Sequence, residues 1–109
     1  MSPTRLGYKM QLHPYNDYKE TNNMALIRKV RGFTPKTGKN CFLAETAVLI
    51  GDVTIGNECS IWYNTVLRGD VNTITIGNRV NIQDGSVLHT LYEKSVIEIG
   101  DNEIGRAHV

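Results

Sequence analysis

The fold is decided between Leu43 and His89, where the sequence repeats in sixes: LAETAV (43–48), LIGDVT (49–54), IGNECS (55–60), IWYNTV (61–66), LRGDVN (67–72) and, after Thr73-Ile74-Thr75, IGNRVN (76–81), IQDGSV (82–87) and Leu88-His89. The count extends outward to a degenerate TGKNCF (37–42) and to Ile99. First positions are aliphatic throughout, and fifth positions, Val71 among them, are small. A period of six fits neither a helix nor simple strand alternation, so each hexad needs a short strand and a corner. The pattern predicts an all-β parallel β-helix of about three full coils.

An antiparallel sandwich would also be rich in Val and Ile, but it has no reason to keep six-residue phase across eight repeats. Residues 24–109 are therefore interpreted as one repeat domain. Residues 1–23 are polar and lack a sustained apolar period. We expect this extension to be disordered, or to lie upstream of a natural start at Met24.

Composition excludes several partners. The chain has 109 residues, with 12 Lys and Arg against 11 Asp and Glu. This balance leaves no basic excess for nucleic acid, so no nucleic-acid partner is expected. No apolar run approaches the roughly 18 residues of a membrane span, and the N-terminus lacks a signal-peptide core, which predicts no membrane partner and a cytoplasmic location. Cys41 and Cys59 stand one coil apart in the small column, so they are expected to stack as two buried, unreactive thiols.

Three hexads per coil also bring residues into columns. One column is glycine in every coil (Gly38, Gly56, Gly77 and Gly100), which indicates either a tight backbone or a close approach by another group. Arg68, Asp70, Gln83, Asp84 and His89 fall on neighbouring faces of two adjacent coils. Each of them alone is typical of a solvated surface or a weak ion pair. Together they form a candidate site.

The run SIWYNTVLRGDVNTITIGNRVNIQDGSVLH (60–89) resembles the signature region of the γ-class carbonic anhydrase-like proteins of the hexapeptide-repeat superfamily. This resemblance implies left-handed coils, a homotrimer and a zinc site between subunits, with iron or cobalt as other candidate metals. It also implies reversible hydration of CO₂ to bicarbonate by zinc-bound hydroxide. By position, His89 matches a zinc ligand, Gln83 a contact of the zinc-bound solvent, and Asp70 a residue that orders the site. Arg68 and Asp84 match a pair that bridges subunits.

The C-terminal end departs from that family pattern. Arg106 follows Ile104-Gly105 where the family has histidine, and a protonated guanidinium does not ligate a metal. The hexad before His108 is one residue short, another family histidine would fall two residues beyond Val109, and the family's C-terminal helix is absent. We therefore interpret this end as truncated, and expect the chain as given to hold no complete zinc site and to be inactive. A coenzyme-A-dependent acyltransferase and a non-catalytic trimeric scaffold remain as alternative functions.

Overall fold

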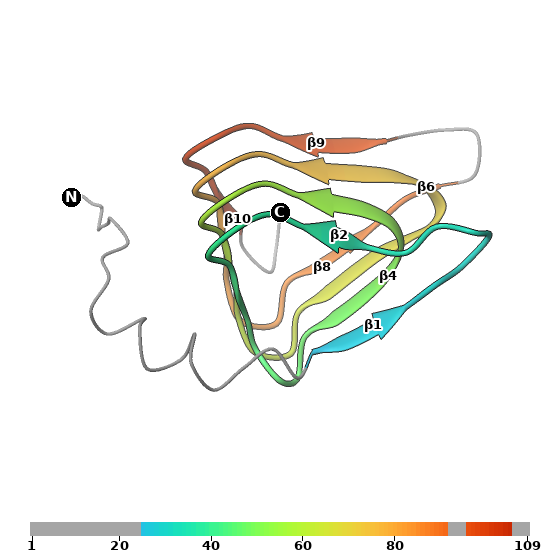
Figure 1. Cartoon of the computed structure of the whole chain (residues 1–109), viewed down its shortest axis with the longest axis horizontal. Coiled ribbons are helices and arrows are strands. Elements are labelled where there is room, and N and C mark those ends of the chain that lie inside the picture. Colours follow the sequence, from blue (N-terminus) through green and yellow to red (C-terminus); the bar gives the residue numbers. More distant parts are fainter. Residues whose placement is uncertain (1–24, 92–95, 106–109) are drawn as a thin grey trace.

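In the computed structural model, which describes residues 25–91 and 96–105, the chain winds as a triangular coil of parallel strands (Figure 1). The expected extension 1–23, Arg106 and His108 lie outside the described residues. No helix that could cross a membrane occurs in the part of the chain that the structure describes. The described strands are β1 (Leu26–Arg28), β2 (Lys36–Thr37), β3 (Phe42–Leu43), β4 (Val48–Ile55), β5 (Ser60–Ile61), β6 (Val66–Ile76), β7 (Asn81–Ile82), β8 (Val87–His89), β9 (Ile97–Ile99) and β10 (Ile104–Gly105).

These strands stack into three walls, and within each wall the strands run parallel. The first wall contains β1, the first halves of β4 and β6, and β8. The second contains β2, the second halves of β4 and β6, and β9. The third contains β3, β5, β7 and β10. Each wall thus has four strands, and the described residues make a left-handed β-helix of about four turns.

The predicted fold class is confirmed, but the expected number of about three coils is too low. The difference arises before the recognised hexads, where Leu26–Arg28 pairs in register with Val48–Ile50 and opens the first coil. The hexad count missed this strand because a seven-residue connection, 29–35, separates it from β2. The six-residue phase cannot be followed across such a connection.

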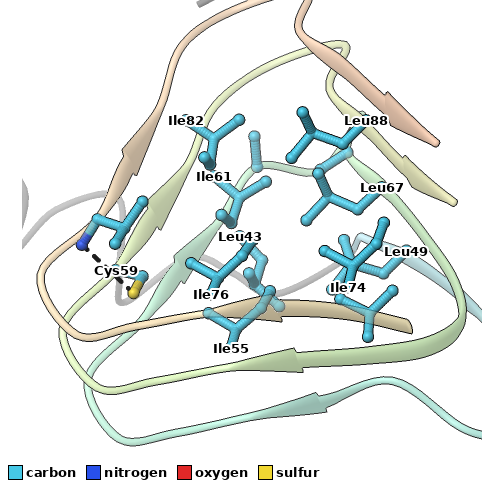
Figure 2. Packing of buried hydrophobic residues seen from close by; sticks show 14 of the residues in the cluster. Leu43, Leu49, Ile55, Cys59, Ile61, Leu67, Ile74, Ile76, Ile82 and Leu88 are labelled. Carbon is cyan, nitrogen blue, oxygen red and sulfur yellow. Dashed lines mark hydrogen bonds between the residues drawn. The ribbon is translucent and has the colours of Figure 1, made fainter. Parts of the chain in front are cut away.

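The aliphatic first positions form the core. Leu49, Leu67, Ile61 and Ile82 are fully buried, and Figure 2 shows the side chains of Leu49 and Leu67, from the first wall, facing those of Ile61 and Ile82, from the third. Full burial of a side chain of this size contributes about 1.5–3 kcal/mol. The regular column of such residues is therefore what makes the coil stable.

The small inward column is also present, with one correction. The structure pairs Val53 with Ile74, which is fully buried, while Val71 is only half-buried. One residue separates Gly51 from Val53, whereas four residues, 70–73, separate Gly69 from Ile74. The three extra residues bulge outward at the corner between the first and second walls. The prediction for Val71 was wrong because it placed the insertion after that corner.

The last hexad also differs from expectation. The register stays intact through 99–104, so Ile104 pairs with Asn81 and Gly105 with Ile82. Ile104 is consequently 57% exposed, and Gly105 takes the place of a core aliphatic. No residue is missing from this hexad, so the expected one-residue gap before His108 was wrong: the pairing keeps the six-residue phase, and a glycine stands at the inward first position.

The corner between the second and third walls repeats in every coil. Its fourth hexad position has a left-handed backbone, with φ of 57–63° at Asn40, Glu58, Arg79 and Asn102. At the third position, side-chain oxygens join successive coils: Asn57 Oδ1 accepts a hydrogen bond from Lys39 N, Asn78 Oδ1 from Asn57 N, and Asp101 Oδ1 from Asn78 N, each at 2.8 Å. This ladder draws the coils together beside the glycine column.

The two cysteines occupy equivalent places one coil apart. Cys41 Sγ and Cys59 Sγ each donate to a glycine carbonyl of the following coil, at 3.1 Å. Neither cysteine forms a disulfide. Cys59 is fully buried as predicted, but Cys41 is only half-buried, because it lies in the first coil and is covered on one side by the described residues. A hydrogen bond with Cys41, together with burial, raises the pKa of the Cys59 thiol far above its usual range.

Candidate functional site

The first wall brings Arg68 and His89 together. They pair in register on β6 and β8, so their backbones lie about 4.8 Å apart and both side chains point outward into solvent. Ile50 and Arg28 continue the same column toward the first coil. The hexad register had predicted that Ile50, Arg68 and His89 share a column, and the pairing confirms it.

Asp70 extends this cluster from the end of the first wall. Its Oδ2 lies 3.7 Å from Arg68 Nε, and the two side chains are 33% and 47% exposed. An ion pair this long and this exposed contributes little to stability. Its effect is positional, because it holds a carboxylate beside the Arg68 and His89 column.

Asp70 is also held through its backbone. Arg31 Nε, from the connection between β1 and β2, donates to the Asp70 carbonyl oxygen at 2.8 Å. Thr73 Oγ1, in the same insertion, donates to Asp52 Oδ2 at 2.7 Å. Arg31 and Asp52 were not singled out from the sequence, because the insertions at this corner do not follow the hexad count and give no signal of where they fold.

Gln83 lies on the neighbouring third wall, just after β7. Its Nε2 donates to Asn81 Oδ1 at 3.2 Å, and Trp62 Nε1 donates to the same oxygen at 2.5 Å. Asn81 therefore orients the Gln83 amide and the Trp62 indole together. The sequence analysis missed Asn81, although its spacing of two from Gln83 would have placed both side chains on the same side of the strand.

Asp84 occupies the corner between the third and first walls. Its Oδ1 accepts a hydrogen bond from Tyr63 N at 3.2 Å, which ties this corner to the preceding coil. The Asp84 carboxylate is exposed, and Tyr63 packs beside Trp62 with ring centroids 6.4 Å apart. The five predicted residues thus occupy two adjacent coils and two adjacent walls.

The residues described do not fit a complete zinc centre. His89 is the single histidine among residues 25–91 and 96–105. Within those ranges, no three His, Cys, Asp or Glu side chains lie close enough together to hold a metal ion. A catalytic zinc site takes three protein ligands and keeps a fourth position open. One imidazole beside the Arg68 guanidinium falls short of that donor set.

The chain is similar to hexapeptide-repeat proteins and to carbonic anhydrases. Residues 34–69 match the family described as bacterial transferase hexapeptide (six repeats). A carbonic anhydrase of Geobacillus kaustophilus is 53% identical over 64 residues, covering 59% of this chain and 35% of the relative. Gamma carbonic anhydrase 1, mitochondrial, of Arabidopsis thaliana is 44% identical over 85 residues, covering 78% of this chain and 30% of the relative.

Among solved structures, a hexapeptide transferase family protein from Anaplasma phagocytophilum superposes with a TM-score of 0.69 at 42% identity, covering 75% of this chain and 48% of that one. The chain spans about a third to a half of the length of these relatives. It belongs to the hexapeptide-repeat superfamily of left-handed β-helix proteins. Within that superfamily it is a γ-class carbonic anhydrase-like protein, in agreement with the run at residues 60–89.

Proposed function

We propose that this chain carries part of the active site of a γ-carbonic anhydrase-type lyase, which in its complete form converts CO₂ reversibly to bicarbonate. The observation that supports this proposal is the register of β6 and β8, which sets His89 beside Arg68, with Asp70 and Gln83 at the margins of the same two coils. In the complete protein a zinc ion, or iron or cobalt in its place, would supply an acidified water.

The chain's own residues have separate parts in this proposal. Neutral His89 offers a ring nitrogen as one metal ligand. The Gln83 amide, oriented by Asn81, is a hydrogen-bonding group for a small polar substrate or its bicarbonate product. Asp70, fixed by Arg31 and paired with Arg68, is a positioning residue. Because the described residues supply one imidazole, we propose that the chain as given holds no complete metal site and is inactive, and no catalytic step is assigned to it.

Metal loading tests this proposal. The chain and a His89→Ala variant are incubated with excess zinc, dialysed, and analysed for bound metal and for CO₂ hydration. We expect well below one zinc per chain in both proteins and hydration at the uncatalysed rate. Stoichiometric zinc that disappears in His89→Ala would contradict the incomplete site, whereas an acetyl-coenzyme A titration with saturable binding would favour an acyltransferase. The acyltransferase alternative is supported by the match to hexapeptide transferases. A scaffold role is supported by the incomplete set of metal ligands among the described residues.

We further propose that the chain assembles as a homotrimer in which Arg68 of one subunit reaches Asp84 of the next. Both side chains are exposed, and they stand on adjoining walls. Removing Arg68 would leave the carboxylate without its partner in the interface. Arg68→Ala should therefore lower the trimer fraction in sedimentation, while Arg79→Ala, at a corner of the same coil, should not. An unchanged trimer in Arg68→Ala would exclude this bridging role.

Cys41 and Cys59 stand one coil apart and form no disulfide, which supports a reducing compartment. We propose a cytoplasmic location on this ground and on the composition.

A further inference from the structure

Cys41 and Cys59 stand at the same corner of two successive coils, where the second wall turns into the third. The residues that follow them, Phe42 and Ser60, pair in register, and Phe42 N donates to the Cys59 carbonyl oxygen at 2.9 Å. The α-carbons of the two cysteines are therefore about one strand spacing apart, about 4.8 Å. This spacing lies within the range of about 4.4–6.8 Å that a disulfide requires.

The Cys41 sulfur is directed toward the coil that contains Cys59. Cys41 Sγ donates to the Gly56 carbonyl oxygen and Cys59 Sγ to the Gly77 carbonyl oxygen, each at 3.1 Å, so each thiol reaches into the following coil. The two thiols are also hydrogen-bonded to each other. Figure 2 shows Cys59 at the corner of its coil, to one side of the aliphatic core. The two sulfurs can thus meet without a rearrangement of the core.

The two thiols differ in their access to solvent. Cys41 is half-buried, whereas Cys59 is fully buried. A small reagent in solution can therefore reach the Cys41 sulfur, and it reaches Cys59 only after Cys41 has reacted. An accessible cysteine beside a second, sheltered cysteine is the arrangement by which an oxidised thiol is resolved to a disulfide. The half-burial of Cys41 is thus what distinguishes this pair from the two unreactive thiols expected from the sequence.

We propose that Cys41 and Cys59 are a redox modification site, at which a small-molecule disulfide such as glutathione disulfide converts the two thiols to an intramolecular disulfide. Cys41 loses its proton to solvent and its sulfur attacks one sulfur of the oxidant, whose S–S bond breaks and releases one glutathione thiol. Cys59 then loses its proton, attacks the Cys41 sulfur and releases the second glutathione thiol. Two protein thiols are oxidised, and one oxidant disulfide is reduced to two thiols.

The contacts around the pair indicate that this disulfide is reversible. Neither sulfur can donate once the S–S bond has formed, so the Gly56 and Gly77 carbonyl oxygens lose their thiol hydrogen bonds. That loss favours the dithiol, while the cross-link favours the disulfide because it restricts the unfolded chain. The dithiol is then the resting form under reducing conditions. Oxidation adds a covalent link between two coils that otherwise join through backbone and side-chain hydrogen bonds.

Thiol counting under native conditions tests this site. The chain is reduced, desalted, incubated with a large excess of glutathione disulfide, alkylated in urea with N-ethylmaleimide and analysed by mass spectrometry. We expect the loss of both alkylation sites and, after non-reducing digestion, a peptide that links Cys41 to Cys59. Dithiothreitol should restore both sites.

Two matched variants separate the steps. Cys59→Ala should stop at a mixed disulfide between Cys41 and glutathione, whereas Cys41→Ala should remain unmodified because Cys59 is fully buried. Alanine already occupies the same small column at Ala47, which is fully buried, so both substitutions suit the fold.

The proposal is overturned if the parent chain keeps both thiols, if it stops at a mixed disulfide, or if the new disulfides join different chains on a non-reducing gel. Modification of Cys41→Ala as fast as Cys59→Ala would contradict the order of attack. Circular dichroism of the oxidised parent chain should retain the β-sheet signal. Oxidation only together with loss of that signal would place the reaction in the unfolded chain and would also overturn the proposal.

Discussion

Replacing Gly56 by Ala should destabilise the coil, although any residue can adopt the backbone conformation of Gly56. Gly56 is not among the residues with positive φ, so alanine introduces no dihedral strain there. Its added Cβ would instead lie 2.5 Å from Asn78 Oδ1 and 2.6 Å from the carbonyl oxygen of Gly77, both in the next coil. The conflict therefore lies between coils and is absent within the Gly56 strand itself.

The cost follows from what must move. Backbone cannot turn away as a flexible side chain can, so the next coil has to shift outward by several tenths of an ångström. Overpacking of this kind costs about 1–3 kcal/mol. The shift also lengthens the 2.8 Å hydrogen bond from Asn57 N to Asn78 Oδ1, at about 1 kcal/mol. Alanine stabilises by about 0.4–1 kcal/mol through restricting the unfolded chain, which leaves a net loss of about 1–4 kcal/mol.

Gly100→Ala is the matched control. Gly100 occupies the same column with no atom within 4 Å of an added Cβ, so this substitution should be neutral or slightly stabilising in dilute protein. Urea unfolding at one low protein concentration measures both variants, and an unchanged m value ensures that the midpoints compare stability. Equal midpoints for Gly56→Ala and Gly100→Ala would refute the close approach of coils as the reason for the glycine column.

Two further predictions concern the stacked thiols. The raised pKa of Cys59 keeps its thiol protonated in the folded state, while the unfolded thiol ionises above about pH 8.5, so the free energy of unfolding should fall as pH rises beyond that value, by at most about 1.4 kcal/mol per pH unit. Urea unfolding at pH 7 to 10 measures this slope, and its persistence in Cys59→Ala would show that other groups cause it. In the folded protein a thiol reagent should modify half-buried Cys41 well before fully buried Cys59, and equal rates would contradict the inward register of Cys59.

The fold was predictable from the sequence because each hexad repeats the same local structure. An aliphatic residue enters the core at the first position, a small one fits where the wall bends, and the polar pair between them forms a corner. The hexad count alone aligns Leu49 with Leu67 across a coil, and the two residues pair as expected. The errors lie where spacing departs from six. The connection 29–35 concealed β1, and the insertion at 70–73 replaced Val71 by Ile74 in the inward column.

The candidate site likewise contains residues that the hexad count predicted and contacts that it did not. Arg68 and His89 sit on regular strands, so the hexad count alone made them neighbours. The contacts that orient the site come from elsewhere: Arg31 reaches Asp70 from a residue 39 positions earlier, and Asn81 holds Gln83 through a side-chain oxygen. The six-residue period of the sequence does not predict where a connection between the walls folds. It also does not predict which side chain donates a hydrogen bond to which.

A repeating wall also explains why one chain can place a metal-ligating residue and still lack a metal centre. Within one chain the walls are flat, and neighbouring columns diverge around the triangle, so His89 has outward neighbours chiefly along its own column. That column contains Arg68, Ile50 and Arg28, and none of these is a metal ligand. Further donors have to face His89 from outside the described walls, from another subunit or from residues beyond those described. Stoichiometric zinc in the chain as given would show that such donors exist. Arg68→Ala would then test whether they come from a neighbouring subunit. If they do, this variant should lose zinc binding and the trimer together.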